Sequence, residues 1–247
     1  MKELHVVALS GGKDSTAMAL RLRELYPDRL FTFVCTPTGN ELPVMFQHWA
    51  NLKDILGGNF IPIMGGTLEG LIESQNCIPN FRIRWCTRML KIEPYAAWLM
   101  KQSEIYDRVV SYVGLRADEE EREGGDYSAI PGVEMVFPMR GWNWGINEVT
   151  GYLNQRGMVI PERTDCALCF WQTLGEWWVL WKENPEMYQR GVEIEQAMGH
   201  TFRSESRDTW PAALIDLAKE FESGRIPPRT KRQLDLFGQM TCRVCRK

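Results

Sequence analysis

The stretch Leu4-His5-Val6-Val7-Ala8-Leu9-Ser10-Gly11-Gly12-Lys13-Asp14-Ser15 decides the fold class. An apolar strand runs directly into a polar loop with two adjacent glycines, and a helix follows. Glycines let the backbone approach an anion closely, and the N–H groups of the loop and the helix start then point at it. The Walker pattern G-x-x-x-x-G-K-[ST] is absent, so this loop is expected to hold the phosphates of ATP in another way.

Composition favours one sizeable α/β protein. The chain has 247 residues, 44% of them hydrophobic, and a net charge of −3. From Arg225 to Lys247 there are seven basic residues and one acidic residue, which predicts either a solvated tail or a contact for nucleic acid or an acidic partner. No signal peptide precedes the first strand and no run of 18 apolar residues exists, so we expect a cytoplasmic protein that is not in a membrane. In that compartment seven cysteines are not expected to form disulfides.

Strands and helices alternate along the first two thirds of the chain. Apolar strands are expected at 4–10, 30–35, 59–64, 108–115 and 133–138, and helices at 16–26, 43–56, 67–74, 94–101 and 146–156. This alternation predicts an α/β fold, a parallel sheet with helices on both faces. After residue 160 strands disappear, tryptophans cluster, and helices are expected at 175–183, 185–198 and 209–223. We therefore divide the chain into an α/β nucleotide domain at 1–160, a helical portion at 161–224 and a basic tail at 225–247.

Five segments resemble one protein family in its own order. Ser10–Ser15 resembles the PP-loop of N-type ATP pyrophosphatases, and 36–43 (TPTGNELP) resembles the D-T-G-x-E-x-P segment of their PAPS reductase-like branch. The segments 84–94 (RWCTRMLKIEP), 114–122 (GLRADEEER) and 138–142 (PMRGW) are similar to further motifs of that branch. The resemblance implies an adenine nucleotide alpha hydrolase-like, Rossmann-like fold. It also implies cleavage of ATP between its α and β phosphates, with AMP passed to an acceptor and pyrophosphate released.

The resemblance also implies site residues. It puts Ser10, Gly11, Gly12, Lys13, Asp14 and Ser15 around the ATP phosphates, with Thr38 and Gly39 in the same nucleotide site. Lys13 would neutralise charge on the leaving pyrophosphate, and Asp14 would either hold Mg²⁺ or cap the following helix. Arg84, Lys91 and Arg116 would either clamp a phosphate or sulfate-like anion or form ion pairs with the acidic run at 118–123. Lys13, Asp14 and Arg116 are the expected catalytic residues.

Three cysteines form the second chemical set. Cys166 and Cys169 make a C-x-x-C pair, and alignment with the iron–sulfur sulfate reductases places Cys86 beside them as a ligand of a 4Fe-4S cluster. A rival arrangement joins this pair to Cys242 and Cys245 in a Zn²⁺ site. In further alternatives Cys242 and Cys245 form a redox dithiol or donate a fourth cluster ligand, or no metal is bound.

Three functions remain open from the sequence. The first is an enzyme that adenylylates a nucleic acid, a nucleotide or a small metabolite and then transfers sulfur from a separate donor. The second is a phosphosulfate reductase that uses a cysteine of the tail, although such enzymes have usually lost the complete loop that this chain keeps. The third is a nucleotide-sensing or scaffold protein without turnover. A homodimer is compatible with each.

Overall fold

The computed structural model describes residues 1–125, 127–205 and 207–227, and its centre is a five-stranded parallel sheet. The strands are β1 (Glu3–Ala8), β2 (Phe31–Cys35), β3 (Asn59–Pro62), β4 (Arg108–Tyr112) and β5 (Val133–Val136), in the order β3-β2-β1-β4-β5. In the central register Val7 pairs with Phe33 on one side and with Tyr112 on the other. The predicted α/β class is confirmed.

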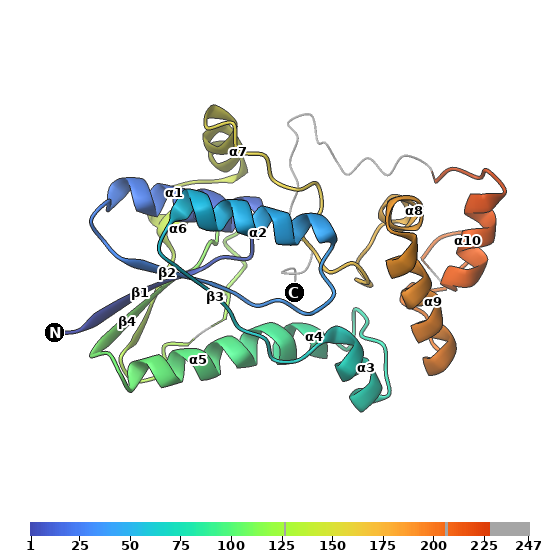
Figure 1. The fold of residues 1–247 in the computed structure, drawn as a ribbon, viewed down its shortest axis with the longest axis horizontal. Helices are drawn as coiled ribbons and strands as arrows, with labels where there is room; N and C mark the ends of the chain where they lie inside the picture. Colours follow the sequence, from blue (N-terminus) through green and yellow to red (C-terminus); the bar gives the residue numbers. More distant parts are fainter. Residues whose placement is uncertain (126, 206, 228–247) are drawn as a thin grey trace.

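Helices cover both faces of this sheet (Figure 1). The helices α1 (Lys13–Leu25), α2 (Pro43–Leu56) and α7 (Ile146–Gln155) share an apolar core with one face, and α6 (Pro138–Gly141) adds Met139 to it. On the other face α5 (Glu93–Ser103) packs through Tyr95 and Leu99 against Val6 and Val109. Successive residues of β1, Val6 and Val7, thus enter opposite cores, as the pleat of a strand buried on both faces requires.

The remaining helices form a group beside the carboxyl ends of the strands (Figure 1). They are α3 (Leu68–Gln75), α4 (Trp85–Thr87), the π-helical turn η1 (Arg88–Ile92), α8 (Leu174–Glu183), α9 (Pro185–Met198) and α10 (Leu214–Glu222). Trp177 is fully buried at their centre, in a cluster that also takes in Leu42, Leu68 and Leu90. The expected helical portion therefore shares its core with residues of the first 160, which fixes its position against the sheet.

Several element boundaries differ from expectation. Helix α1 begins at Lys13 rather than at residue 16, so Asp14 and Ser15 lie in its first turn. Helix α10 begins at Leu214 rather than at 209, because the backbone before it is bound elsewhere: the Trp210 N–H donates to Asp208. The segments α4, η1 and α6 were not expected, since each is only three to five residues long.

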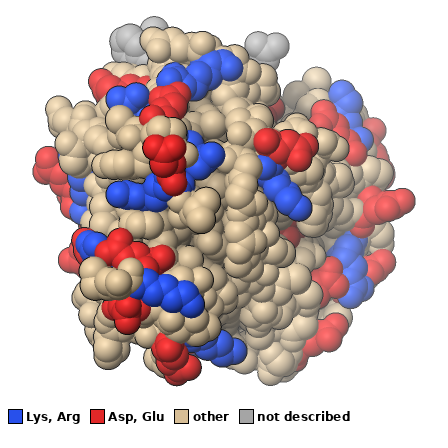
Figure 2. Space-filling model, turned by 60° about the vertical axis from the view of Figure 1, so that its left-hand side comes forward, with Lys and Arg blue, Asp and Glu red and all other residues tan. Residues whose placement is uncertain are grey.

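Charges of both signs are interspersed on the face of the described residues in Figure 2. Exposed ion pairs of the described residues include Arg108 with Glu134 and Arg156 with Glu24. Interspersed charges give little long-range attraction for a polyanion over that face. Within the described residues, none of the helices is both long enough and apolar enough to cross a bilayer.

A buried carboxylate joins α9 to α10. Glu195 is 6% exposed, and its two oxygens accept hydrogen bonds from the N–H groups of Phe202 (2.8 Å) and Leu214 (2.6 Å). Burial raises the pKa of Glu195 to about 7, although the two N–H groups act in the opposite direction. The first turn of α10 therefore depends on a group that titrates near neutrality.

We expect this carboxyl to make stability depend on pH. Its folded pKa is raised, so its contribution to stability is complete below about pH 4.5, the unfolded value, and is lost as the pH rises through about 7. Relative to Glu195→Gln, the free energy of unfolding of the wild type should fall by up to about 3 kcal/mol between pH 4.5 and 8. Urea titrations across this range measure it. Glu193→Gln, on the exposed side of the same helix, should leave the slope unchanged.

Candidate nucleotide and cysteine site

A cavity of about 340 Å³ lies at the carboxyl ends of the strands, where ligands of open α/β sheets bind. Its lining includes Lys13 from the start of α1, Thr36 after β2 and Gly114 after β4. A Cβ on Gly114 would come within 3.3 Å of the Ser15 backbone, so the glycine lets the loop after β4 pass close to α1. The motifs that follow separate strands in the sequence thus meet at one place.

The loop 10–15 is folded around the start of α1. Gly11 has a φ of +86°, a conformation that glycine adopts without strain, and Gly12 is the N-cap. The Ser15 hydroxyl donates to the Gly12 carbonyl oxygen at 3.1 Å and lies 3.0 Å from Ser10 Oγ. The N-terminal end of α1, with its partial positive charge and Lys13, therefore borders the cavity, which suits an anion.

Asp14 lines the cavity and forms an ion pair with Arg116, which does not line it. Arg116 Nη1 donates to Asp14 Oδ2 at 2.9 Å, while Asp14 Oδ1 is buried without a hydrogen-bond partner among the described residues. Burial raises the pKa of the Asp14 carboxyl, against the opposing charges of Arg116 and Lys13. Gly12 caps α1 without a side-chain hydrogen bond, so the alternative of Asp14 as the helix cap is not what the geometry shows.

Arg116 lies in a network of carboxylates. It is 2% exposed, and besides Asp14 it contacts Asp118 at 2.8 Å and Glu119 at 3.4 Å. Asp118 in turn accepts from the N–H of Ile146 at the start of α7. Arg116 does not itself line the cavity. The sequence left two alternatives for Arg116, anion binding and ion pairing with the acidic run. Its described contacts match ion pairing, and the arginine in these pairs is buried rather than on the surface.

Thr38 contacts the cysteine loop, and neither Thr38 nor Gly39 lines the nucleotide cavity. Thr38 Oγ1 lies 3.2 Å from Cys166 Sγ, and its N–H and hydroxyl both donate to Glu41 Oε1 at 2.7 Å. Glu41 and Cys166 form an isolated antiparallel bridge. Gly39 has a φ of +71° and would place a Cβ 2.8 Å from Thr67. Their assignment to the nucleotide site stays a prediction that this arrangement does not support.

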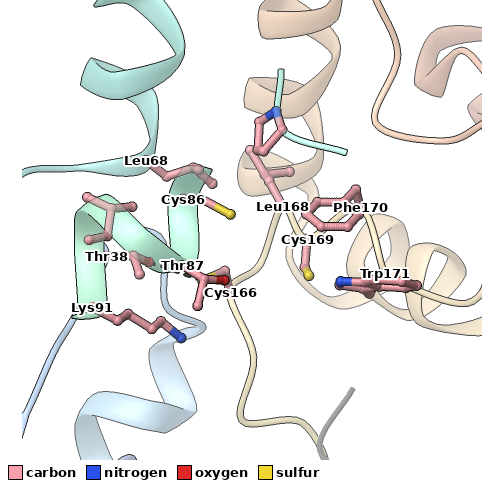
Figure 3. Close-up of a pocket in the computed structure, with 12 residues that line it drawn as sticks. Thr38, Leu68, Cys86, Thr87, Lys91, Cys166, Leu168, Cys169, Phe170 and Trp171 are labelled. Atoms are coloured by element: carbon pink, nitrogen blue, oxygen red, sulfur yellow. Dashed lines mark hydrogen bonds between the residues drawn. The ribbon is translucent and has the colours of Figure 1, made fainter. Parts of the chain in front are cut away.

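Cys86, Cys166 and Cys169 line one small cavity of about 30 Å³ (Figure 3). Cys86 comes from α4, and the other two come from the loop before α8, 80 residues later. The other walls are largely apolar, with Leu68, Leu90, Leu168, Phe170 and Trp171 among them. Among the described residues no three His, Cys, Asp or Glu side chains are arranged around a single metal ion. Cys242 and Cys245 lie outside the described residues.

Arg163 is a site residue that the sequence analysis missed. It lies half-buried three positions before Cys166, and its guanidinium donates to the Cys166 and Ala167 carbonyl oxygens and to Gln172. Arg163 therefore holds the backbone of the C-x-x-C loop in place through two of its carbonyl groups. A basic residue just before the first cysteine is the only signal in the sequence, and it does not distinguish a buried side chain from a solvated one.

Two residues separate the two cavities. Thr87 and Lys91, on α4 and η1, each line both the cysteine cavity and the nucleotide cavity. Figure 3 shows the Lys91 side chain extending along this boundary near Thr87 and Cys166. Arg84, the third expected anion ligand, instead lies with its guanidinium 5.9 Å from the centre of the Trp171 ring. Lys91 is thus placed for a role in either cavity.

Three solved structures are similar to this chain. The first is the U34-tRNA thiolase NcsA from Methanococcus maripaludis with its 4Fe-4S cluster, at 15% identity and a TM-score of 0.49, covering 99% of this chain and 80% of that one. The second is a PAPS reductase from Candida auris in a phosphate complex, at 12% identity and 0.44, covering 66% and 76%. The third is a predicted subunit of tRNA methyltransferase from Methanocaldococcus jannaschii, at 15% and 0.34, covering 64% and 89%.

These similarities are too distant to bear on the reaction. No protein-family model matches the sequence, and no curated protein matches it. The PAPS reductase bears the name of the family branch that the motifs resemble. The resemblance to PP-loop proteins therefore rests on the five motifs and on the parallel sheet that carries them.

The Arg116 network predicts a large effect on stability. Arg116→Met would leave the buried Asp14 carboxylate without its counter-ion, and we expect a loss of about 3–5 kcal/mol in the free energy of unfolding. Asp14→Asn in the same background should recover at least about 1 kcal/mol. Arg108→Met, which removes an exposed arginine with two carboxylate partners, is the control and should change little. Equal losses in the two single variants, measured by urea unfolding, would contradict the prediction.

Proposed function

We propose that this chain is an ATP-dependent, adenylylating sulfurtransferase. It would cleave ATP to AMP and pyrophosphate on the loop 10–15 and receive sulfur from the cavity of three cysteines. The observation that carries this proposal is the shared wall: Thr87 and Lys91 border both the cavity at the phosphate loop and the cavity at Cys86. The loop 10–15 borders one of the two cavities that Lys91 lines, and the three thiols border the other. This arrangement suits a reaction that needs a nucleotide and a sulfur species together.

The nucleotide half acts through charge and position. The N–H groups at the start of α1 and the ammonium of Lys13 would neutralise the pyrophosphate as it leaves. Mg²⁺ prefers carboxylate and phosphate oxygens, and the unpartnered Oδ1 of Asp14 is suited to such an ion or to one of its waters. Arg116 would then hold Asp14 in place through Oδ2 rather than bind the anion itself.

The cysteine half has the donor chemistry of an iron–sulfur site. Cys86, Cys166 and Cys169 would hold a 4Fe-4S cluster, because thiolates are the usual ligands of such clusters and these three thiols line one cavity. The cavity has room for about one water molecule, so a cluster would have to displace the side chains that close it. Such a cluster, held by these three thiolates, would supply an iron to which the sulfur to be transferred could bind. The Arg163 guanidinium at the cysteine loop would offset part of the negative charge.

The proposed reaction has two steps that balance. An acceptor oxygen attacks the α-phosphorus of ATP, a new P–O bond forms, and the bond to pyrophosphate breaks. A sulfur nucleophile at the oxidation level of hydrosulfide then attacks the activated atom of the acceptor, AMP leaves with the oxygen, and the proton goes to solvent. The acceptor is a nucleic acid, a nucleotide or a small metabolite. Neither step needs an external reductant.

Removal of the Lys13 charge should abolish pyrophosphate release. With ATP labelled at the α-phosphate, Mg²⁺ and sulfide, the wild type is tested separately with bulk tRNA, duplex DNA and a nucleoside mixture, and AMP and pyrophosphate are measured. We expect Lys13→Ala to lower the rate with any active acceptor by about 100-fold or more, because it removes charge stabilisation at the leaving group. Lys53→Ala, on α2 away from the cavity lining, should keep the rate.

Two outcomes would reject this function. Formation of ADP and phosphate would indicate cleavage at the γ-phosphate. Reduction of adenylylated sulfate to sulfite without ATP, unaffected by Lys13→Ala, would indicate the reductase instead.

The cysteine site predicts a metal content. Protein purified without oxygen should contain about four irons and equal sulfide, with a broad absorbance near 400 nm. Single replacements of Cys86, Cys166 or Cys169 by serine should lower the iron content, while Cys77→Ser, whose thiol does not line the cavity, should keep it. One zinc per chain without iron would reject the cluster and favour the Zn²⁺ alternative.

A further inference from the structure

Two donors on α2 hold the backbone carbonyls of the phosphate loop. Trp49 Nε1 donates to the Ser10 carbonyl oxygen at 3.0 Å, and His48 Nε2 lies 2.9 Å from the Gly11 carbonyl oxygen. A carbonyl oxygen only accepts hydrogen bonds, so the proton of this contact lies on His48 Nε2. Neighbouring residues of one helix therefore bind two consecutive carbonyl groups of the loop.

These bonds determine which way the loop's N–H groups face. In a planar trans peptide the C=O and N–H groups point in opposite directions. With the carbonyls of Ser10 and Gly11 turned to α2, the N–H groups of Gly11 and Gly12 are turned away from that helix. The Gly12 N–H donates to Ser10 Oγ (N···O 3.3 Å), and both Ser10 and Gly12 line the nucleotide cavity, so an anion there would take the place of, or share, this hydrogen bond. The hydrogen bonds from α2 to the loop carbonyls therefore set the orientation of the N–H groups that an anion would bind.

The contact between α2 and the loop is close. A Cβ on Gly11 would lie 2.7 Å from Trp49 Nε1 and 3.1 Å from Met45 Cε, so a side chain at residue 11 would displace the Trp49 side chain that holds the loop. His48 is 5% exposed and lies on the buried side of α2 with Met45 and Leu52. Helix α2 is therefore anchored in the core and gives a fixed reference for a loop whose glycines would otherwise move freely.

We propose that His48 and Trp49 are positioning residues that hold the backbone of the phosphate loop so that Gly12, which lines the nucleotide cavity, presents its N–H group to the phosphates of ATP. This inference rests on the proposed function, because it takes ATP as the ligand of the loop. Neither side chain lines the cavity, so both act through the loop backbone and not by touching the nucleotide. In the sequence His48 has no metal-like spacing to another histidine, and Trp49 fits the apolar periodicity of a helix.

Binding measurements on the intact chain test the inference. Trp49→Phe keeps the ring but removes its N–H, and His48→Leu removes the imidazole donor. We expect each variant to bind Mg·ATP and Mg·pyrophosphate about 3- to 10-fold more weakly, the value of one hydrogen bond, with adenosine affinity unchanged. His48→Gln should restore wild-type affinity, because its amide can donate to the same carbonyl. Gln47→Leu, on the exposed side of α2, is the matched control.

A second readout separates this inference from the proposed function. Hydrogen exchange at the amides of Gly11 and Gly12 in the free protein should be faster in Trp49→Phe and His48→Leu than in the wild type and in Gln47→Leu. Wild-type protein that binds neither ATP nor pyrophosphate would overturn the proposed function, whereas unchanged exchange and affinity in the variants would overturn only the positioning role. Equal loss of adenosine and ATP binding would indicate general packing and would also overturn it.

Discussion

The pairing of two loops at the carboxyl edge of the sheet is the interaction on which the rest of the site depends. The Asn40 carbonyl oxygen accepts from the Ala167 N–H at 2.6 Å, and its side-chain oxygen accepts from the Leu168 N–H at 2.8 Å. Asn40 is 4% exposed, so both bonds form away from water, and loss of either partner would leave a buried polar group unsatisfied. One buried asparagine thus joins the α/β part to the helical portion.

Two glycines of the site let backbone segments approach neighbouring elements closely. Gly11 lies against the Trp49 and Met45 side chains of α2, and Gly114 lets the loop after β4 contact the Ser15 backbone. Because Asp14 is one residue away, the carboxylate reaches Arg116 on the loop that follows β4. A side chain at residue 11 would displace those of Trp49 and Met45, and one at residue 114 would press on the Ser15 backbone.

The sequence predicted the sheet because apolar runs mark the buried strands, and motifs that follow parallel strands were expected at the carboxyl edge of the sheet. The grouping of Cys86 with Cys166 and Cys169 came instead from the resemblance to the iron–sulfur sulfate reductases. Arg163 and Asn40 were not predicted, since their roles exist only once segments distant in the chain are in contact. Arg116 shows the same limit: its sequence neighbours suggested both alternatives, but its pairing with Asp14 spans 102 residues.

The position of Lys91 follows from how the chain turns between the two cavities. Cys86 and Lys91 are five residues apart, on α4 and on the π-helical turn η1 that continues it. A π turn adds a residue to the helical repeat and so changes the direction of the side chains after it. Thr87 and Lys91 then border both cavities while Cys86 faces only one. A lysine, with its long flexible stem, can balance negative charge on either side, whereas the planar guanidinium of an arginine would suit only one geometry.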